Sequence, residues 1–369
     1  MTQELRVLYI DDEATHRKDL HELLSNEIIN GFTINMDCEA SFEKAVERSA
    51  NFHLAILDLY EGNPKDEKNM GSSVFEKLKT SFFIPIIFYS GNTKDVNNLK
   101  SQVVGVATKG DGGIEELKSE IKRLTKQNIP FLKNRVHGYI EQEFRKYFWD
   151  VIQKNNDIFV ADADDYSLGY MLLRNFADSL SKENIKSIIG DKTISPEKVH
   201  PMEFYIYPTN SSKEFENGEI IKNKKNDEIS VILTPSCDFI ERYKKGINEG
   251  RSVENVMLIR TKLLTEFKEF KDYQQAQNKD NTNKLEKLLN SGKSDRYFFL
   301  PQVPFIQNRV IDFQSNTSVS YNELSHNYER IAKLDAPFAQ SMTSSFIRYY
   351  NRIGFPDIDT DYIKAHLGI

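Results

Sequence analysis

The chain has 369 residues, of which 39% are hydrophobic and 28% are charged. These fractions are typical of globular proteins and exclude a largely disordered or fibrous chain. The length exceeds the usual size of one domain, roughly 100–200 residues, so we expect at least two domains. The net charge of −6 opposes general binding to nucleic acids, which depends on clustered lysine and arginine.

No segment of the sequence predicts secretion or insertion into a membrane. The first residues lack a basic stretch followed by an apolar core, and no run of about 18 apolar residues occurs anywhere in the chain. The two cysteines, Cys38 and Cys237, are too few and too far apart for a disulfide framework. We therefore expect a cytoplasmic protein without a membrane partner.

Short apolar runs alternate with amphipathic segments through the first 126 residues. The runs predict strands at residues 5–10, 33–38, 54–58, 84–90 and 103–107. The amphipathic segments predict helices at residues 15–24, 42–48, 72–79, 94–100 and 114–127. This alternation predicts an α/β fold, a flavodoxin-like doubly wound sheet of five parallel strands.

Polar residues stand where four of these strands end. They are Asp11 and Asp12 after the first strand, Asp58 at the third, Ser90 at the fourth and Lys109 after the fifth. The C-terminal ends of parallel strands meet at one edge of the sheet, where folds of this class bind ligands. Three carboxylates there would repel one another unless a divalent cation lay among them, and Mg²⁺ prefers such oxygen ligands. A lysine and a hydroxyl would counter the charge of a phosphoryl group, so the set predicts a site of phosphoryl transfer.

Residues 1–126 resemble the receiver domain of bacterial two-component response regulators. The segments that carry the resemblance are VLYIDDEA, LAILDLY, IIFYSG and ATKG, in that order. The resemblance implies that Asp58 accepts a phosphoryl group from a histidine kinase or phosphotransfer protein. It also implies that Asp11, Asp12 and Asp58 bind Mg²⁺, and that Ser90 and Lys109 contact the phosphate. The alternative is a domain that keeps this fold without being phosphorylated.

Two features depart from the receiver pattern. The segment LYEGNPKDEKNMG that follows Asp58 is longer than the usual loop, and it is a candidate for kinase specificity. Receivers often have an aromatic residue shortly before the lysine, whereas residues 103–108 contain none. We therefore do not expect the usual aromatic relay from phosphate to output.

Residues 127–195 predict a helical linker between the receiver and a second domain. Proline cannot continue a helix, so Pro130 predicts a break, followed by helices at 132–154 and 167–180. The first of these helices carries an apolar, aromatic-rich stripe. Such a stripe is usually ordinary core. The alternative is an interface for a homodimer or for passing the receiver's signal onward.

Residues 196–369 predict an α+β output domain around a small, mostly antiparallel sheet or barrel. Strands are expected at residues 203–207, 219–222, 229–234, 254–260, 296–300 and 310–313. Residues 262–289 predict helix with a loose tip, and a final helical part is expected from about residue 328 or earlier and over 338–350.

The segment TPSCD contains the one candidate site of this domain, Cys237 with Asp238. A cysteine beside an aspartate is compatible with thiol catalysis or with a binding pocket. No cysteine-protease signature surrounds it, and small buried cysteines are common, so a structural role is the favoured interpretation. No zinc site is expected, because the histidines and cysteines lack ligand spacing.

The segments TPSCD, YFFLP and APFAQSMTSSFIRYYNRIGFPD resemble an uncharacterised output domain found beside receivers in bacterial signalling and phage-defence operons. The first functional hypothesis is a regulatory module that binds a protein partner, as in a regulator that diverts phosphate in defence signalling. The second is a DNA-binding transcription regulator, although no helix-turn-helix with a basic recognition helix is visible. The third is an enzyme gated by the receiver, but no known catalytic motif is present, so no activity is expected beyond self-phosphorylation and dephosphorylation.

Overall fold

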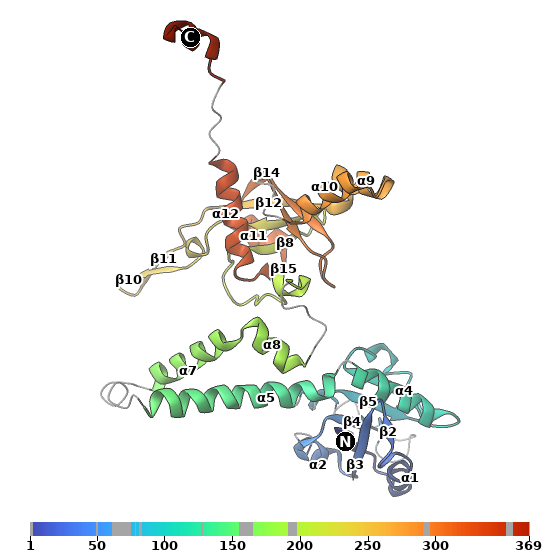
Figure 1. Ribbon diagram of the computed structural model, residues 1–369. Helices are drawn as coiled ribbons and strands as arrows, with labels where there is room; N and C mark the ends of the chain where they lie inside the picture. Colours follow the sequence, from blue (N-terminus) through green and yellow to red (C-terminus); the bar gives the residue numbers. More distant parts are fainter. Residues whose placement is uncertain are drawn as a thin grey trace. The chain divides into compact units, whose positions relative to one another are not determined.

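The computed structural model describes residues 3–48, 51–60, 75–77, 79–80, 83–126, 128–154, 165–190, 198–290, 296–351 and 357–368. The chain divides into two compact units, Met1–Thr193 and Ile194–Ile369 (Figure 1). Within the described ranges, no helix is long and apolar enough to cross a membrane.

The first unit is built on a sheet whose strand order, in the described residues, is β2-β3-β1-β4-β5-β6. The strands are β1 (Gln3–Ile10), β2 (Ile28–Ile29), β3 (Phe32–Glu39), β4 (Leu54–Leu57), β5 (Ile86–Ser90) and β6 (Val104–Thr108). Every pair is parallel except the short β2–β3 pair, which the sequence did not predict. The five parallel strands have the flavodoxin-like order, so the predicted α/β fold is confirmed.

Apolar side chains bury the sheet on both faces. Tyr9 packs in one core cluster with Leu117 of α4 (Gly113–Lys126), whereas Leu8 and Phe88 lie in the cluster of the opposite face. Successive strand residues point to opposite faces, so β1 supplies both clusters. Helix α1 (Ala14–Leu24) follows β1 in the chain, and helix α2 (Phe42–Arg48) follows β3.

Two elements predicted within residues 1–126 differ from the structure or lie partly outside the described residues. The helix predicted at residues 94–100 is wrong, because only a 3₁₀ turn, η3 (Asn97–Leu99), forms there. Of the helix predicted at 72–79, residues 75–77 are helical, as are 79–80. Most of the segment LYEGNPKDEKNMG, from residue 61 onward, lies outside the described residues.

A helical region follows the parallel sheet within the first unit. It comprises α5 (Ile129–Lys146), the π-helical η4 (Tyr147–Ile152), α7 (Asp165–Ser179) and α8 (Lys182–Ile189) (Figure 1). Asn128, with a left-handed φ of 56°, separates α4 from α5, and Pro130 lies in the first turn of α5, where it costs no hydrogen bond. The break predicted at Pro130 is therefore confirmed. Phe131 joins the core of the parallel sheet and anchors the start of α5.

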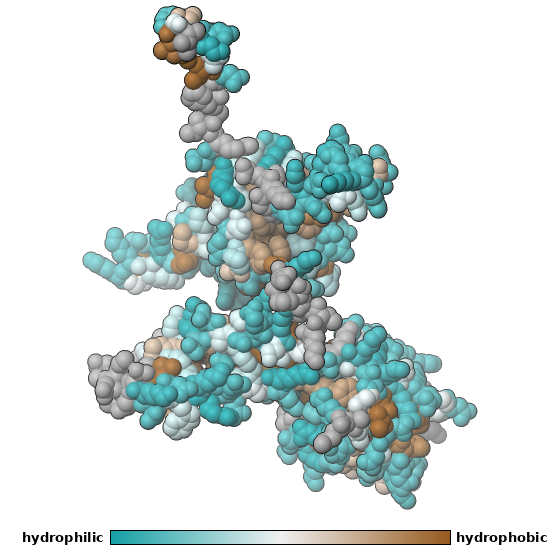
Figure 2. All heavy atoms as spheres, viewed as in Figure 1, coloured by the Kyte–Doolittle hydropathy of each residue, from teal (hydrophilic) through white to brown (hydrophobic). Residues whose placement is uncertain are grey.

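The far part of this helical region exposes several large apolar side chains. Phe148 is 54% exposed and Trp149 57%, and Leu173 on α7 is 59% exposed. The visible surface of the protein is otherwise mostly hydrophilic, with scattered hydrophobic patches (Figure 2). The interpretation of the aromatic stripe as ordinary core is thus wrong for its end near Phe148, because no other described part of the chain covers these rings.

The second unit is built on an antiparallel sheet with the order β13-β14-β12-β9-β8-β15-β7 among the described residues. Its strands are β7 (Tyr205–Ile206), β8 (Glu219–Asn223), β9 (Ile229–Ile232), β12 (Asn255–Leu263), β13 (Tyr297–Leu300), β14 (Arg309–Ser320) and β15 (Tyr328–Leu334). A separate hairpin is formed by β10 (Arg242–Lys244) and β11 (Ile247–Gly250). The predicted antiparallel α+β character of this region is confirmed, and the sheet is larger than expected.

The helices of the second unit agree only partly with the prediction. They are α9 (Lys268–Gln275), α10 (Lys279–Leu289), α11 (Tyr321–Asn327), α12 (Phe338–Tyr350) and α13 (Thr360–Leu367). The helix expected from about residue 328 or earlier is present only in its earlier part, as α11, and it is wrong from residue 328 onward, because β15 begins there and pairs with β8. The strand expected at 203–207 is shorter than predicted, because residues 203 and 204 belong to the 3₁₀ turn η5 (Pro201–Phe204) and only 205 and 206 form β7, and α13 was not predicted.

Candidate functional site

The C-terminal ends of β1, β4 and β6 bring Asp11, Asp58 and Lys109 together. Lys109 Nζ lies 2.6 Å from Asp11 Oδ2 and 2.7 Å from Asp58 Oδ2. Strands β1 and β4 are neighbours, and the backbone N–H of Asp58 donates to the carbonyl of Ile10 at 2.9 Å, whereas β5 lies between β4 and β6. Three residues that are distant in sequence therefore form one charged cluster, as the strand pattern predicted.

Asp11 is fully buried and hydrogen-bonded through both carboxylate oxygens. Oδ1 accepts from the backbone N–H of Glu13 at 2.8 Å, and Oδ2 accepts from the hydroxyl of Tyr9 at 2.5 Å. Burial disfavours the charged carboxylate, but the hydrogen bonds from Lys109 and Tyr9 outweigh it and hold the pKa of Asp11 below its ordinary value. Asp11 is thus an anion at neutral pH.

Lys109 supplies the positive charge of the cluster. Burial acts against the ammonium, but its hydrogen bonds to Asp11 and Asp58 outweigh burial and raise the pKa of Lys109. The Asp58 carboxylate also accepts the backbone N–H of Leu59 through Oδ1, at 2.7 Å. Its side chain is 12% exposed, so solvent reaches Asp58 but not Asp11.

Ser90 and Asp12 lie at the same edge of the sheet. Ser90 is the last residue of β5, and its carbonyl accepts the backbone N–H of Lys109 at 2.9 Å. Its side chain is buried, whereas Asp12, directly after Asp11, is half-buried. The structure therefore places all five predicted positions at one edge, with Asp11, Asp58 and Lys109 in direct contact.

Two residues of this cluster were missed by the sequence reasoning. Tyr9 stands two positions before Asp11, and a period of two along a strand could have indicated that both point to the same side. His16, in the first turns of α1, approaches Asp11 Oδ2 to 3.5 Å and Lys109 Nζ to 3.4 Å through Nδ1. No spacing signal in the sequence indicates this approach.

The cluster also supplies donors for a metal ion. Asp11, His16 and Asp58 each offer a ligand atom, and these atoms all lie within 4.8 Å of one another. Carboxylate oxygens and an imidazole nitrogen are common ligands of divalent cations in proteins. The residues present therefore fit a divalent cation, and Asp58 would be both a ligand and the carboxylate that solvent reaches.

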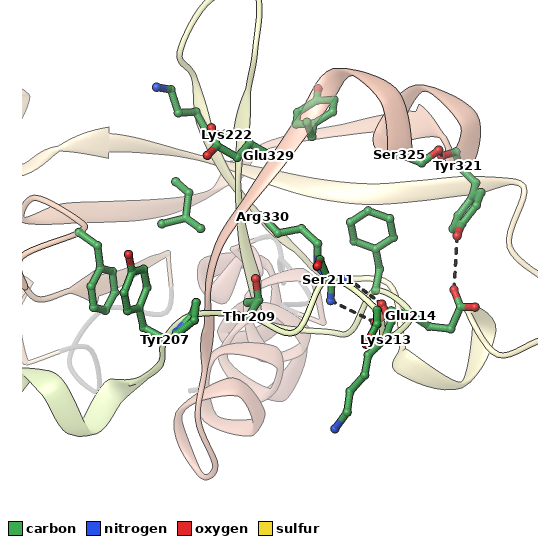
Figure 3. Close-up of a pocket in the computed structure, with 16 residues that line it drawn as sticks. Tyr207, Thr209, Ser211, Lys213, Glu214, Lys222, Tyr321, Ser325, Glu329 and Arg330 are labelled. Carbon is green, nitrogen blue, oxygen red and sulfur yellow. Dashed lines mark hydrogen bonds between the residues drawn. The ribbon is translucent and has the colours of Figure 1, made fainter. Parts of the chain in front are cut away.

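The second unit has a pocket of about 830 Å³ beside β15 (Figure 3). Its wall includes Tyr207, which stacks on Phe305 with ring centroids 4.0 Å apart. Its most buried cation, Arg330, is already bound: the guanidinium pairs with Glu219 and donates to the backbone carbonyls of Lys213 and Glu214. The pocket thus has an aromatic wall, but its arginine is committed to the fold.

The candidate output site, Cys237 and Asp238, lies in a 3₁₀ turn before the β10–β11 hairpin. The expectation of a small buried cysteine is wrong, because Cys237 is exposed. Its thiol donates to Asp238 Oδ1 at 3.7 Å. Thiol catalysis would need a base such as a histidine, but the ring of His200 accepts the backbone N–H of Met202 instead. His200 is thus engaged in a local turn.

No protein-family model and no curated protein matches the chain. Several solved structures resemble part of it. A response regulator receiver protein from Sinorhizobium medicae is 16% identical, with 34% of this chain and 97% of that chain covered and a TM-score of 0.26. The Vibrio cholerae chemotaxis protein CheY4 is 17% identical, with 33% and 98% covered and a TM-score of 0.25. A two component transcriptional regulator AraC from Clostridium phytofermentans is 22% identical, with 36% and 98% covered and a TM-score of 0.26. Function must therefore be inferred from the geometry of Asp11, Asp58 and Lys109.

Proposed function

We propose that the protein is a response regulator of a two-component phosphorelay. Residues 1–126 would form the receiver, which takes a phosphoryl group onto Asp58 from a histidine kinase or phosphotransfer protein. The observation that carries the proposal is the Lys109 ammonium, which bridges Asp58 and the buried Asp11 at the edge where parallel sheets bind ligands.

The chemistry follows from the charges of the cluster. An oxygen of Asp58 attacks phosphorus, the new O–P bond forms, and the bond from phosphorus to the donor's imidazole nitrogen breaks with its electron pair on nitrogen. Asp11, Asp12 and Asp58 would hold Mg²⁺, which supplies charge neutralisation to the phosphoryl oxygens. Lys109 counters the same charge from the other side.

The switch would use the end of β5. The buried Ser90 ends the strand that pairs with β6, which leads into Lys109, and a shift of this strand end would let its hydroxyl contact a phosphoryl oxygen. Such a shift gives a two-state element that phosphorylation biases. The proposal thus links chemistry at Asp58 to a movement at Ser90.

Labelling with radioactive acetyl phosphate and Mg²⁺ tests the phosphoacceptor. We expect label on wild type and none on Asp58→Asn. Asp95→Asn, at an exposed aspartate that follows β5, is the matched control and should label like wild type. Equal labelling of Asp58→Asn and wild type would contradict the assignment.

For the rest of the chain we propose a linker at residues 127–195 and a regulatory output domain at 196–369 that binds a protein partner. The exposed rings of Phe148 and Trp149 support a homodimer through the helical region, because large apolar side chains in solvent are typical of protein interfaces. A cytoplasmic regulator that diverts phosphate in bacterial defence signalling is the role we favour.

Light scattering after size-exclusion chromatography tests the homodimer, with and without beryllofluoride as the phosphoryl mimic. We expect the mass of a dimer for the wild-type protein and of a monomer for Trp149→Asp. Tyr350→Asp, at an exposed tyrosine of α12 in the other unit, should leave the dimer intact. A monomeric wild type in both conditions would remove the dimer from the proposal.

A further inference from the structure

His16 faces the charged cluster from α1, outside the strand ends that supply its other members. Its Nδ1 lies 3.5 Å from Asp11 Oδ2, and its side chain is 42% exposed. A histidine at this place adds a nitrogen donor to a site that otherwise offers oxygen atoms.

The ammonium of Lys109 marks the point on which three donors converge. Nζ lies 2.6 Å from Asp11 Oδ2, 2.7 Å from Asp58 Oδ2 and 3.4 Å from His16 Nδ1. A positive charge therefore already occupies the position that two carboxylates and one imidazole surround. A metal cation at this position would replace the ammonium, which is then free to turn toward a phosphoryl group.

The two ring nitrogens of His16 have different neighbours. Nε2 lies 3.5 Å from Glu13 Oε2, and Nδ1 lies 3.4 Å from the Lys109 ammonium, which can only donate, so a proton on Nε2 suits both neighbours. This tautomer leaves the lone pair of Nδ1 directed at the cluster. Metal-binding histidines in proteins are commonly fixed in this way by a carboxylate partner on the other nitrogen.

We propose that His16 is a third metal ligand of the site, so that the site favours a divalent transition metal such as Co²⁺ or Zn²⁺ over Mg²⁺. Imidazole suits these ions, whereas Mg²⁺ takes oxygen ligands and retains most of its water. The inference rests on the proposed receiver function only for the location of the metal. It adds that the first helix determines which metal the receiver holds.

Metal titration of the untagged full-length protein tests this inference. Co²⁺ binding is followed by visible absorption and Mg²⁺ binding by calorimetry, for wild type and for His16→Ala. We expect His16→Ala to bind Co²⁺ about tenfold or more weakly and Mg²⁺ about twofold or less weakly. Loss of a residue that only supports a metal ligand already lowers metal affinity by about tenfold, so loss of a ligand should lower it at least as much. His16→Gln, which offers an oxygen instead, should show the same fall in the Co²⁺ to Mg²⁺ ratio. His21→Ala, on the same helix, should leave both affinities unchanged.

The outcomes separate this inference from the proposed function. An unchanged Co²⁺ to Mg²⁺ ratio in both His16 variants overturns the inference, even if Asp58 accepts phosphate from acetyl phosphate. A ratio that falls in both variants supports it, even if wild-type Asp58 takes no label. Circular dichroism of each variant shows that a loss of binding is not a loss of fold.

Discussion

The hydroxyl of Tyr9 donates a hydrogen bond of 2.5 Å to Oδ2 of Asp11. Both side chains come from the end of β1, and Tyr9 is as fully buried as Asp11. Burial and the contact with Asp11 raise the pKa of the Tyr9 hydroxyl far above its ordinary value. The tyrosine therefore remains a neutral donor whenever Asp11 is an anion, and its hydrogen bond stabilises that anion from the buried side of the site.

Replacing Tyr9 by phenylalanine should destabilise the protein and raise the pKa of Asp11. Hydrogen bonds to charged groups contribute about 1.5–3 kcal/mol, so a loss of this size is expected in urea unfolding. Tyr89→Phe is the control, because Tyr89 is also buried, at 7% exposed on β5, and this change leaves the Tyr9 donor to Asp11 in place. Unfolding of Tyr9→Phe at the wild-type urea concentration would contradict the assigned role.

Lys109→Met should be less stable than wild type, and divalent metal should restore part of the loss. Removing the ammonium leaves Asp11 and Asp58 with no cation between them, and breaking a buried pair costs about 3–5 kcal/mol. Thermal unfolding with and without Mg²⁺ measures the effect. We expect Mg²⁺ to raise the melting temperature of the variant more than that of wild type, which already has a cation in place. Equal shifts would show that metal and lysine do not compete for the carboxylates.

The cluster of Asp11, Asp58 and Lys109 was predictable because parallel strands bring their C-terminal ends to one edge. Asp11, Asp58 and Lys109 each follow a short apolar run, and the order of the runs was enough to place them together. The approach of His16 was not predictable, since it depends on how α1 leaves the sheet. A single sequence carries no periodic signal for such a contact.

The second unit was less predictable because long-range pairing decides its elements. Residues 328–334, YERIAKL, contain several good helix formers, yet they form β15. The strand is held by β8, a segment more than a hundred positions earlier, and Arg330 bonds Glu219 across that pair. Propensity within the segment cannot report a partner so distant in sequence, so tertiary pairing overrides it.

Acid should destabilise the first unit through His53, which is buried beside β1. Burial lowers the pKa of His53 to about 4, and its Nδ1 accepts the backbone N–H of Arg6 at 3.1 Å. The folded pKa lies below the unfolded value of 6.5, so the unfolded state takes up the proton first. Stability is full above pH 6.5 and falls as the pH drops through 4, by about 3 kcal/mol in total.

The His53→Asn variant isolates this contribution. The amide oxygen of asparagine can accept the Arg6 N–H but does not titrate. We expect wild type to lose more unfolding free energy than the variant between pH 7 and pH 4.5, by about 2 kcal/mol. If both proteins lose the same amount, His53 is not the group that senses acid.

The second unit contains an ion pair that is almost fully buried. Arg330 contacts Glu219 in a bidentate arrangement, with Nε 2.7 Å from Oε2, and the two side chains are 13% and 1% exposed. Burial raises the pKa of Glu219, and the guanidinium of Arg330 opposes that rise. The arginine is therefore what allows a charged carboxylate to exist between β8 and β15.

Arg330→Met should cost about 3–5 kcal/mol in urea unfolding at pH 7, because it leaves the Glu219 carboxylate buried without a partner. The pKa of Glu219 is already raised by burial and should rise further, so the folded variant binds a proton more readily than the unfolded chain and regains stability as the pH falls. Replacing both residues, as Glu219→Leu with Arg330→Met, should cost less than Arg330→Met alone.

Arg260→Met is the matched control: Arg260 pairs with Glu228 at 2.8 Å, but it is 53% exposed, so a loss of about 1 kcal/mol or less is expected. Equal losses in the two arginine variants would show that burial of the Glu219 pair does not determine its contribution.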